Sequence, residues 1–338
     1  MLDIVAGLLG GLGLFFVGLR QLGAQLQALA GRRMRQAVAL ATRGPWSAGA
    51  LGLMLGALTQ SSNAVAGIAA SLRAADLIEP RRALPLVAWA NAGTAGLVFL
   101  ASLDLRFAAF WVLGLAGFAT WFGQARLRAA AGVLTAMGLL LLGLGLLKAS
   151  AAPLRDLDAV RELLLLTGDG RLAPLAAGLL FGFVAQSASA VSILVITLHG
   201  AALLTLPQAT AAVIGASMGS GLAVWAMSRG MRGTARQPLV FQAALRVAGG
   251  AAFLALPAAG TLPAALPVPD PLRLAAFFLL LQAVPAAIAA PLHRPIQRLL
   301  DARVPPTPAE AFARPRHIFA RAAEDPASAL ALVAAEQR

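Results

Sequence analysis

Cysteine and tyrosine are absent from this 338-residue chain, and lysine occurs only once, at Lys148. Without cysteine, the chain can form no disulfides, iron–sulfur clusters or thiolate metal sites. Charged residues make up 12% of the sequence, against about a quarter in ordinary soluble domains. Hydrophobic residues make up 59%, and the mean hydropathy is +0.79. This balance excludes a water-soluble globule and predicts an all-α polytopic membrane protein.

The basic residues give a net charge of +13 but form no cluster of the size that nucleic-acid binding needs. We therefore expect a lipid bilayer as the surrounding partner and no nucleic acid. The composition, rich in Ala, Arg and Gly with a single Lys, is typical of a bacterial gene of high GC content. It predicts a multi-pass protein of the bacterial inner membrane. Because the N-terminus lacks a basic stretch and a small-residue cleavage site, no cleaved signal peptide is expected.

The first apolar run predicts a span of about 18 residues that ends at Arg20. The basic amphipathic stretch 25–42 that follows predicts a helix lying in the membrane interface. Further apolar runs, each long enough for a helix, fall at 83–101, 107–123, 129–147, 208–228, 239–258 and 272–292.

Two more apolar segments, 46–72 and 174–198, each have a group of polar residues in the middle. These groups are Thr59-Gln60-Ser61-Ser62-Asn63 and Gln186-Ser187-Ala188-Ser189. A continuous helix would expose such residues to lipid at mid-bilayer, which is costly. We therefore expect two re-entrant helical hairpins, each with its polar tip enclosed by protein.

The two hairpin segments are related by a shift of 126 positions. The shift aligns Gly52-Leu53, Gly56, Gln60-Ser61 and Ala64-Val65 with identical residues in the second segment. It also places Ala90–Thr94 over Ala216–Ser220, so each repeat is expected to contain a broken transmembrane helix and an interfacial helix. The predicted organisation is 1–123 for the first repeat, 124–258 for the second, 259–304 for a final span and membrane exit, and 305–338 for a short cytoplasmic tail.

The placement of basic residues predicts the orientation. If the first span runs from outside to inside and both hairpins are re-entrant, most of the 27 basic residues fall in inner segments. The N-terminus is then outside, the C-terminus is cytoplasmic, and the two repeats are inverted. The segment 148–173 fits least well, because it places four basic residues outside.

Inverted repeats with broken helices near the midplane are typical of secondary transporters. The start of a half-helix offers free N–H groups and a positive dipole end to an oxyanion, and the end of the preceding half-helix offers carbonyls to a cation. The only two asparagines, Asn63 and Asn91, lie at such breaks. Helix capping or interhelical hydrogen bonding is the alternative interpretation of these two residues.

The segments GLGLFFVGL, AGRRMRQAV, GALTQSSNAV and ANAGT, in this order, resemble the type II sodium/phosphate cotransporter family. A repeated Gln-Ser-Ser motif marks that family, and each copy precedes a Gly-Ala-Asn-Ile-Gly-Thr-like segment. The resemblance covers roughly residues 5 to 260. It implies sodium-coupled symport of inorganic phosphate, with Na⁺ as the coupling ion, no other cofactor and no further metal. Residues 305–338 are too few for the PhoU-like domain that bacterial relatives often add.

The resemblance also implies site residues, carried over by position. The phosphate-binding set would be Gln60, Ser61, Ser62, Asn63, Gln186, Ser187 and Ser189. The sodium-binding set would be Gln60, Asn91, Thr94, Gln186, Ser217 and Ser220. The chain departs from the family motif at Asn63 and Ala188, where the family has Ser, which leaves the substrate and the sodium stoichiometry open.

Arg246 lies inside a predicted span, where it could neutralise or gate an anion, or could extend toward the nearer membrane face. No Asp, Glu or His lies deep in a span, which favours Na⁺ over H⁺ and leaves no acid–base group for an enzyme. Two alternatives stay open: transport of another small anion or polar solute, and a phosphate-sensing membrane scaffold that does not transport. A homodimer is also compatible with the sequence.

Overall fold

The computed structural model describes residues 2–41, 44–75, 77–103, 105–122, 125–157, 170–308 and 310. Every regular element in these ranges is helical, which confirms the predicted all-α class. Five segments are long and apolar enough to cross a membrane, as expected of a multi-pass membrane protein. They are Leu2–Leu26, Pro80–Ser102, Ala130–Leu154, Leu206–Ser228 and Asp270–Ala289.

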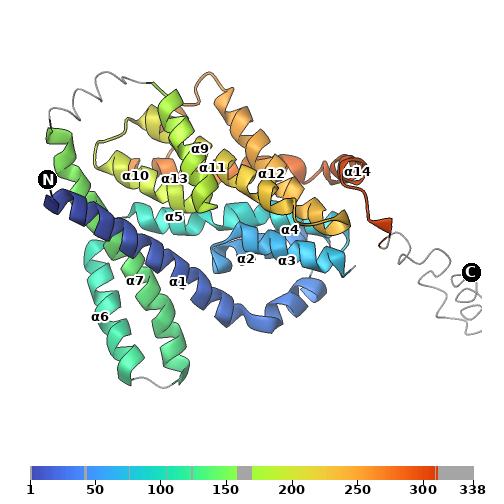
Figure 1. The fold of residues 1–338 in the computed structure, drawn as a ribbon, viewed down its shortest axis with the longest axis horizontal. Coiled ribbons are helices and arrows are strands. Elements are labelled where there is room, and N and C mark those ends of the chain that lie inside the picture. Colours follow the sequence, from blue (N-terminus) through green and yellow to red (C-terminus); the bar gives the residue numbers. More distant parts are fainter. Residues whose placement is uncertain are drawn as a thin grey trace, which may run out of the picture.

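Three long helices, α1 (Leu2–Ala41), α6 (Arg106–Phe122) and α7 (Ala125–Ala151), form one side of the molecule (Figure 1). Small residues allow α1 and α7 to pack closely, since a Cβ atom at Gly18 would lie only 2.4 Å from the backbone nitrogen of Leu140. The outer face of α6 is apolar and aromatic, with Trp111 and Trp121 exposed. In a membrane this face would contact lipid.

The predicted end of the first span at Arg20 falls too early, since the apolar span is Leu2–Leu26. α1 continues without interruption to Ala41 because this stretch contains no proline to break its hydrogen bonding. At about 1.5 Å per residue, its 40 residues extend well beyond the thickness of a bilayer core. The described part of the expected interfacial segment, residues 25–41, is thus the end of α1, whose last turns bend away from its first turns (Figure 1).

Both predicted hairpin segments are interrupted at their polar groups. α2 (Pro45–Thr59) and α3 (Ser62–Ala74) flank the first group, and α9 (Leu172–Ala185) and α10 (Ala188–Gly200) flank the second. A shift of 126 residues moves both bounds of α3 onto those of α10. The helices themselves therefore recur at the spacing that the sequence shows.

The helix packing recurs as well. α2 packs on α4 (Pro80–Gly93), and α9 packs on α11 (Leu206–Ser228). A Cβ at Gly52 would lie 2.1 Å from the carbonyl oxygen of Leu86, and a Cβ at Gly178 would lie 2.1 Å from that of Ala212. The same shift of 126 positions moves Gly52 onto Gly178 and Leu86 onto Ala212. In both units, a glycine therefore allows the two helix backbones to pack closely.

The expected broken helix is found in the first unit only. α4 is followed at once by α5 (Ala95–Ser102), with a turn at Thr94, whose N–H bonds to the carbonyl of Asn91 at 3.3 Å. In the second unit the expectation is wrong, since α11 runs unbroken through Ser217 and Ser220. The Ser220 hydroxyl donates to the carbonyl of Ser217 in the same helix at 2.9 Å, so the polar groups here are accommodated without a break in the backbone.

The remaining helices are α12 (Gly233–Leu254), α13 (Arg273–Ala289) and α14 (His293–Arg303), with short 3₁₀ turns η1 (Ala152–Asp156), η2 (Leu262–Ala265) and η3 (Asp270–Leu272). α12 packs against α3 and α11, and α13 packs against α4 and α12. The runs 239–258 and 272–292 overlap α12 and α13, although α12 begins and ends several residues earlier than its run. An interfacial helix in the second repeat would fall partly in 158–169, and most of the tail is 311–338; both lie outside the described residues.

Candidate functional site

The tips of the two hairpins have the same local geometry. Gln60 and Gln186 each adopt a left-handed backbone, with φ of 49° and 54°, which ends the first half-helix. Ser61 and Ser187 then cap the second half-helix, and each Oγ accepts a hydrogen bond from the backbone N–H three residues later at 3.2 Å. The predicted start of a half-helix at each Gln-Ser pair is therefore confirmed.

The two tips are in direct contact. The side-chain amide of Asn63, in the first turn of α3, donates a hydrogen bond to the backbone carbonyl of Gln186 at 2.8 Å. This bond joins residues that are 123 positions apart. It brings the helix start of one hairpin to the helix end of the other.

Arg246 reaches the same place from α12 and is only 6% exposed. It therefore points into the protein and does not extend toward a membrane face. Its Nη2 donates to Ser62 Oγ, and its Nη1 donates to Ser220 Oγ at 2.9 Å. Its Nε donates to Asn91 Oδ1 at 3.1 Å, and Nη1 also lies 3.5 Å from Asn63 Oδ1. The guanidinium thus joins α3, α4, α11 and α12.

Gln242 lies one helical turn before Arg246 and completes the cluster. Its Nε2 donates to both Asn63 Oδ1 and Asn91 Oδ1, at 3.2 Å each. Its Oε1 is buried and has no hydrogen-bond partner among the described residues, and the same holds for Oε1 of Gln60. A buried carbonyl oxygen without a partner is unfavourable by about 1–3 kcal/mol, so each of these atoms is a ready ligand for a cation or a donor.

The charge of Arg246 is not balanced by a carboxylate. Within the described ranges all its hydrogen-bond acceptors are neutral hydroxyl and amide oxygens. Nor do these ranges contain a group of three or more His, Cys, Asp or Glu side chains that could hold a metal ion. The centre of the molecule is therefore a buried polar cluster with one net positive charge.

The structure brings several of the predicted residues together around Arg246, namely Ser62, Asn63, Asn91 and Ser220. Ser187 and Ser189 lie at the adjoining tip, with their hydroxyl oxygens 3.3 Å apart. Ser61 caps its own helix, and the amide of Gln60 donates to Ala57 O at 2.6 Å. Gln186 contributes its carbonyl to the cluster.

Two further predicted residues are turned elsewhere. The Thr94 hydroxyl donates to the carbonyl of Asn91 at 2.8 Å, within the turn between α4 and α5. The Ser217 hydroxyl accepts a hydrogen bond from Nε2 of Gln282 on α13 at 3.2 Å. Both residues are buried, at 4% and 1% exposure, so they line the interior without contacting the guanidinium.

The residues predicted from the sequence did not include Gln242 and Gln282, which are 0% and 3% exposed. A signal was present, because each is an amide inside an otherwise apolar predicted span. Gln242 also lies four residues before Arg246, which places both on one face of a helix.

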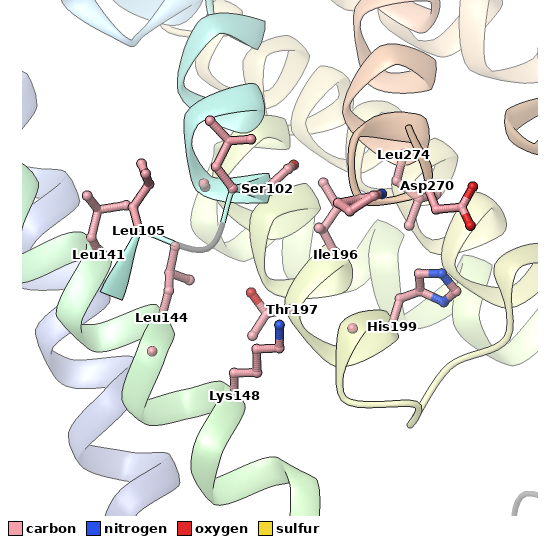
Figure 2. A pocket seen from close by; sticks show the side chains of 15 residues that line it. Ser102, Leu105, Leu141, Leu144, Lys148, Ile196, Thr197, His199, Asp270 and Leu274 are labelled. Atoms are coloured by element: carbon pink, nitrogen blue, oxygen red, sulfur yellow. The ribbon is translucent and has the colours of Figure 1, made fainter. Parts of the chain in front are cut away.

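A separate cavity of about 340 Å³ lies between the ends of α5, α7 and α10 and the start of α13. Figure 2 shows Lys148 and Thr197 pointing into it from facing helices, with His199 beside Asp270 at its edge. Thr197 is eight residues beyond Ser189 on α10, which is about 12 Å along the helix. This cavity is therefore distinct from the cluster around Arg246.

A buried polar cluster at the breaks of paired helices defines a multi-pass membrane protein with an internal polar site. Comparison with known families identifies it further. The model of the Na⁺/Pi-cotransporter family matches residues 14–149 and 156–259, which is more than half of the chain. The chain belongs to this family, as the motifs predicted.

Curated relatives include proteins of Escherichia coli K12, Shigella flexneri and Salmonella typhimurium, each named "Putative inorganic phosphate export protein YjbB". Each is 34% identical over 177 residues, which cover 51% of this chain. The matched region spans only 32% of the length of each relative. No solved structure matches the chain.

Proposed function

We propose that this protein is a secondary transporter that moves inorganic phosphate across the bacterial inner membrane, coupled to Na⁺ in symport. The family and the relatives' names point to a transporter rather than an enzyme. The observation that carries the proposal is the buried charge of Arg246, whose hydrogen-bond partners among the described residues are all neutral. A buried cation is unfavourable without a counter-charge, so the site favours an anion.

Phosphate would bind between Arg246 and the two hairpin tips. The guanidinium presents a planar fork of donors, which suits an oxyanion. The hydroxyls of Ser62, Ser187 and Ser189 and the free N–H groups of the two helix starts would supply further donors. In the structure the oxygens of Asn63 and Asn91 occupy part of the fork, and phosphate oxygens would take their place.

Sodium would bind next to phosphate and balance its charge. Near neutral pH phosphate carries more than one negative charge, so Arg246 alone leaves an excess. A hard cation prefers oxygen ligands. The buried Oε1 atoms of Gln60 and Gln242 have no partner among the described residues and support a cation nearby. Asn91, Thr94, Gln186, Ser217 and Ser220 complete the sodium-binding set that we propose.

Alternating access would come from motion of one unit against the other around this site. The equal helix bounds and equal glycine contacts at a spacing of 126 residues support two equivalent units. We propose that they are inverted, with the N-terminus outside and the C-terminus in the cytoplasm. The excess of basic residues in the segments that would be cytoplasmic supports this orientation.

The test is flux of radiolabelled phosphate into liposomes that contain the purified full-length chain. We expect uptake that requires a Na⁺ gradient and disappears when K⁺ replaces Na⁺. Ser62→Ala should abolish it. Ser71→Ala is the matched control on the same helix, since the exposed Ser71 hydroxyl only bonds back to Gly67 O. Full uptake by Ser62→Ala would contradict the site.

Export is the second candidate, favoured by the printed name of the relatives. A symporter runs in either direction according to the gradients, so loaded vesicles distinguish the two. Efflux that exceeds uptake under equal and opposite gradients would favour an exporter. Competition by sulfate or a small carboxylate as strong as that by phosphate would indicate another anion as substrate, and phosphate binding without flux would indicate a sensor.

A further inference from the structure

Two cavities at one end of the molecule share a wall. One, of about 570 Å³, is basic and is lined by Arg81, Arg294 and Arg298. The other, of about 660 Å³, is apolar and is lined by side chains such as Leu53 and Trp89. Both contain Pro45 and His293 in their walls, so the basic cavity opens directly beside the apolar one.

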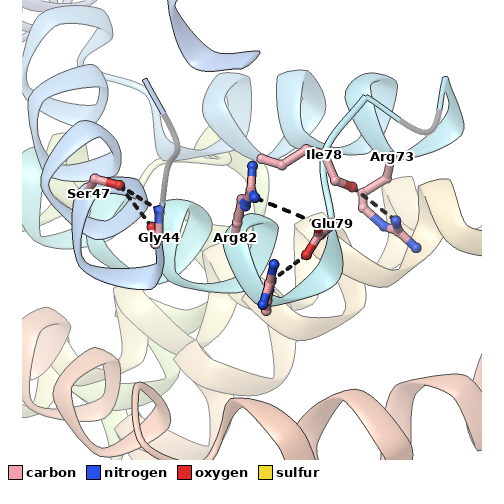
Figure 3. A network of polar contacts seen from close by, with 7 residues as sticks. Gly44, Ser47, Arg73, Ile78, Glu79 and Arg82 are labelled. Carbon is pink, nitrogen blue, oxygen red and sulfur yellow. Dashed lines mark hydrogen bonds and ion pairs between the residues drawn. The ribbon is translucent and has the colours of Figure 1, made fainter. Parts of the chain in front are cut away.

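The basic cavity has a positive charge that its own acid does not balance. Among the described residues that line it, Glu79 is the only acid, and it already pairs with Arg81 and with Arg82, the latter at 3.6 Å (Figure 3). Arg294 and Arg298, one turn apart on α14, are exposed and have no carboxylate partner among the described residues. The cavity is therefore complementary to an anionic group.

The apolar cavity extends from this charged end along α2. Its lining begins at Pro45 and reaches Leu53, eight residues further on, which is about 12 Å of helix. The hydrocarbon core of one leaflet is about 15 Å deep. Trp46 also lines the apolar cavity and is 82% exposed, as is typical of aromatic side chains at the level of lipid headgroups.

The position of the two cavities in the fold is that expected of a site at the membrane interface. Two segments able to span a membrane, Pro80–Ser102 and Asp270–Ala289, have one end here, since Pro80 lines the basic cavity and Ala287 lines the apolar one. α14 follows directly, with Leu299 exposed on one side and Leu300 buried on another. A short helix with arginines and exposed leucines suits the boundary between headgroups and acyl chains.

We propose that these two cavities form a binding site for an anionic phospholipid. Arg294 and Arg298 hold the headgroup phosphate, and an acyl chain lies in the groove between α2, α4 and the end of α13. Neither cavity contains a residue of the Arg246 cluster, so the proposal does not depend on the transport function. Basic cavities of this kind between helices are known to recognise anionic headgroups.

The test is native mass spectrometry of the delipidated full-length chain titrated with dioleoyl phosphatidylglycerol or dioleoyl phosphatidylcholine. We expect phosphatidylglycerol to bind more tightly. Arg294→Gln/Arg298→Gln should weaken it about thirtyfold, since each surface arginine contributes about 1 kcal/mol to binding an anionic lipid. Arg232→Gln/Arg303→Gln removes the same charge from exposed residues outside both cavities and should leave binding nearly unchanged.

A second variant tests the groove. Ala50→Trp would fill it and should weaken phosphatidylglycerol binding without changing the arginines. Equal binding of the two lipids by the natural chain would overturn the proposal, as would equal effects of the two double substitutions. Displacement of phosphatidylglycerol by inorganic phosphate at concentrations comparable to the lipid would also overturn it, because the site would then take a free anion. Thermal melting of each variant checks that it is folded.

Discussion

The substitution Arg246→Gln tests the central site most directly. It removes the positive charge and leaves a shorter, uncharged polar side chain. The variant loses the hydrogen bonds that Arg246 donates to Ser62, Ser220, Asn91 and Asn63. It also loses the positive charge, which no charged group among the described residues of the cluster replaces. Removing the partner of a buried charged group typically costs about 2–5 kcal/mol, which corresponds to a loss of affinity from about thirtyfold to several thousandfold.

The effect of Arg246→Gln on the stability of the protein without phosphate should be small. Burial of an unbalanced charge is itself unfavourable, so its removal offsets the hydrogen bonds that are lost. We therefore expect a similar melting temperature for Arg246→Gln and the natural chain without phosphate. Phosphate should raise the melting temperature of the natural chain only, because a ligand stabilises the state that it binds.

The assay is equilibrium binding of radiolabelled phosphate in detergent and in Na⁺ buffer, together with thermal melting in the presence and absence of phosphate. Arg246→Lys keeps the charge but loses the planar fork of donors. Its phosphate affinity should therefore lie between those of the natural chain and Arg246→Gln. Arg232→Gln makes the same change of charge at an exposed residue at the start of α12 and serves as the control. Phosphate binding by Arg246→Gln equal to that of the natural chain would refute the reasoning.

Three further predictions concern sodium, packing and pH. Gln242→Leu should raise the Na⁺ concentration needed for half-maximal phosphate binding, because it removes a buried oxygen proposed as a cation ligand. The control Gln21→Leu, at an exposed position of α1, should not change it. Equal Na⁺ dependence of the two variants would exclude Gln242 as a cation ligand. Gly178→Val should lower the stability by about 1–3 kcal/mol or more, since its Cβ would lie 2.1 Å from the carbonyl of Ala212, while Gly67→Val, with open space around it, should have a much smaller effect on the melting temperature. Desolvation acts to raise the pKa of Glu310, but hydrogen bonds from Thr307 and Thr234 outweigh it and lower the pKa below the ordinary 4.5. Its contribution to stability is therefore present above that value and lost as the pH falls through the lower folded-state pKa. Glu310→Gln should reduce the acid-side dependence of the melting temperature on pH, and an unchanged pH profile would show that Glu310 does not stabilise the start of α12.

Much of the fold follows from local patterns. Apolar runs give the helices because backbone groups in a membrane must be bonded within a segment. The Gln-Ser pairs give the breaks, since Ser61 and Ser187 need only their own next turn to act as caps. The end of α1 was mispredicted, because a single arginine does not break a helix without a change in backbone bonding.

The composition and the repeated motifs thus determined, by themselves, a helical membrane protein of this family with two polar helix breaks. Only the tertiary structure decided that these breaks meet, through Asn63 and the carbonyl of Gln186, and that Arg246 turns inward to join them. It also decided that Gln242 belongs to the site and that Thr94 and Ser217 do not touch the guanidinium. The reason is that caps and apolar runs depend on neighbours within a turn or two, whereas the direction of a buried charge depends on helices more than 150 residues away in the sequence.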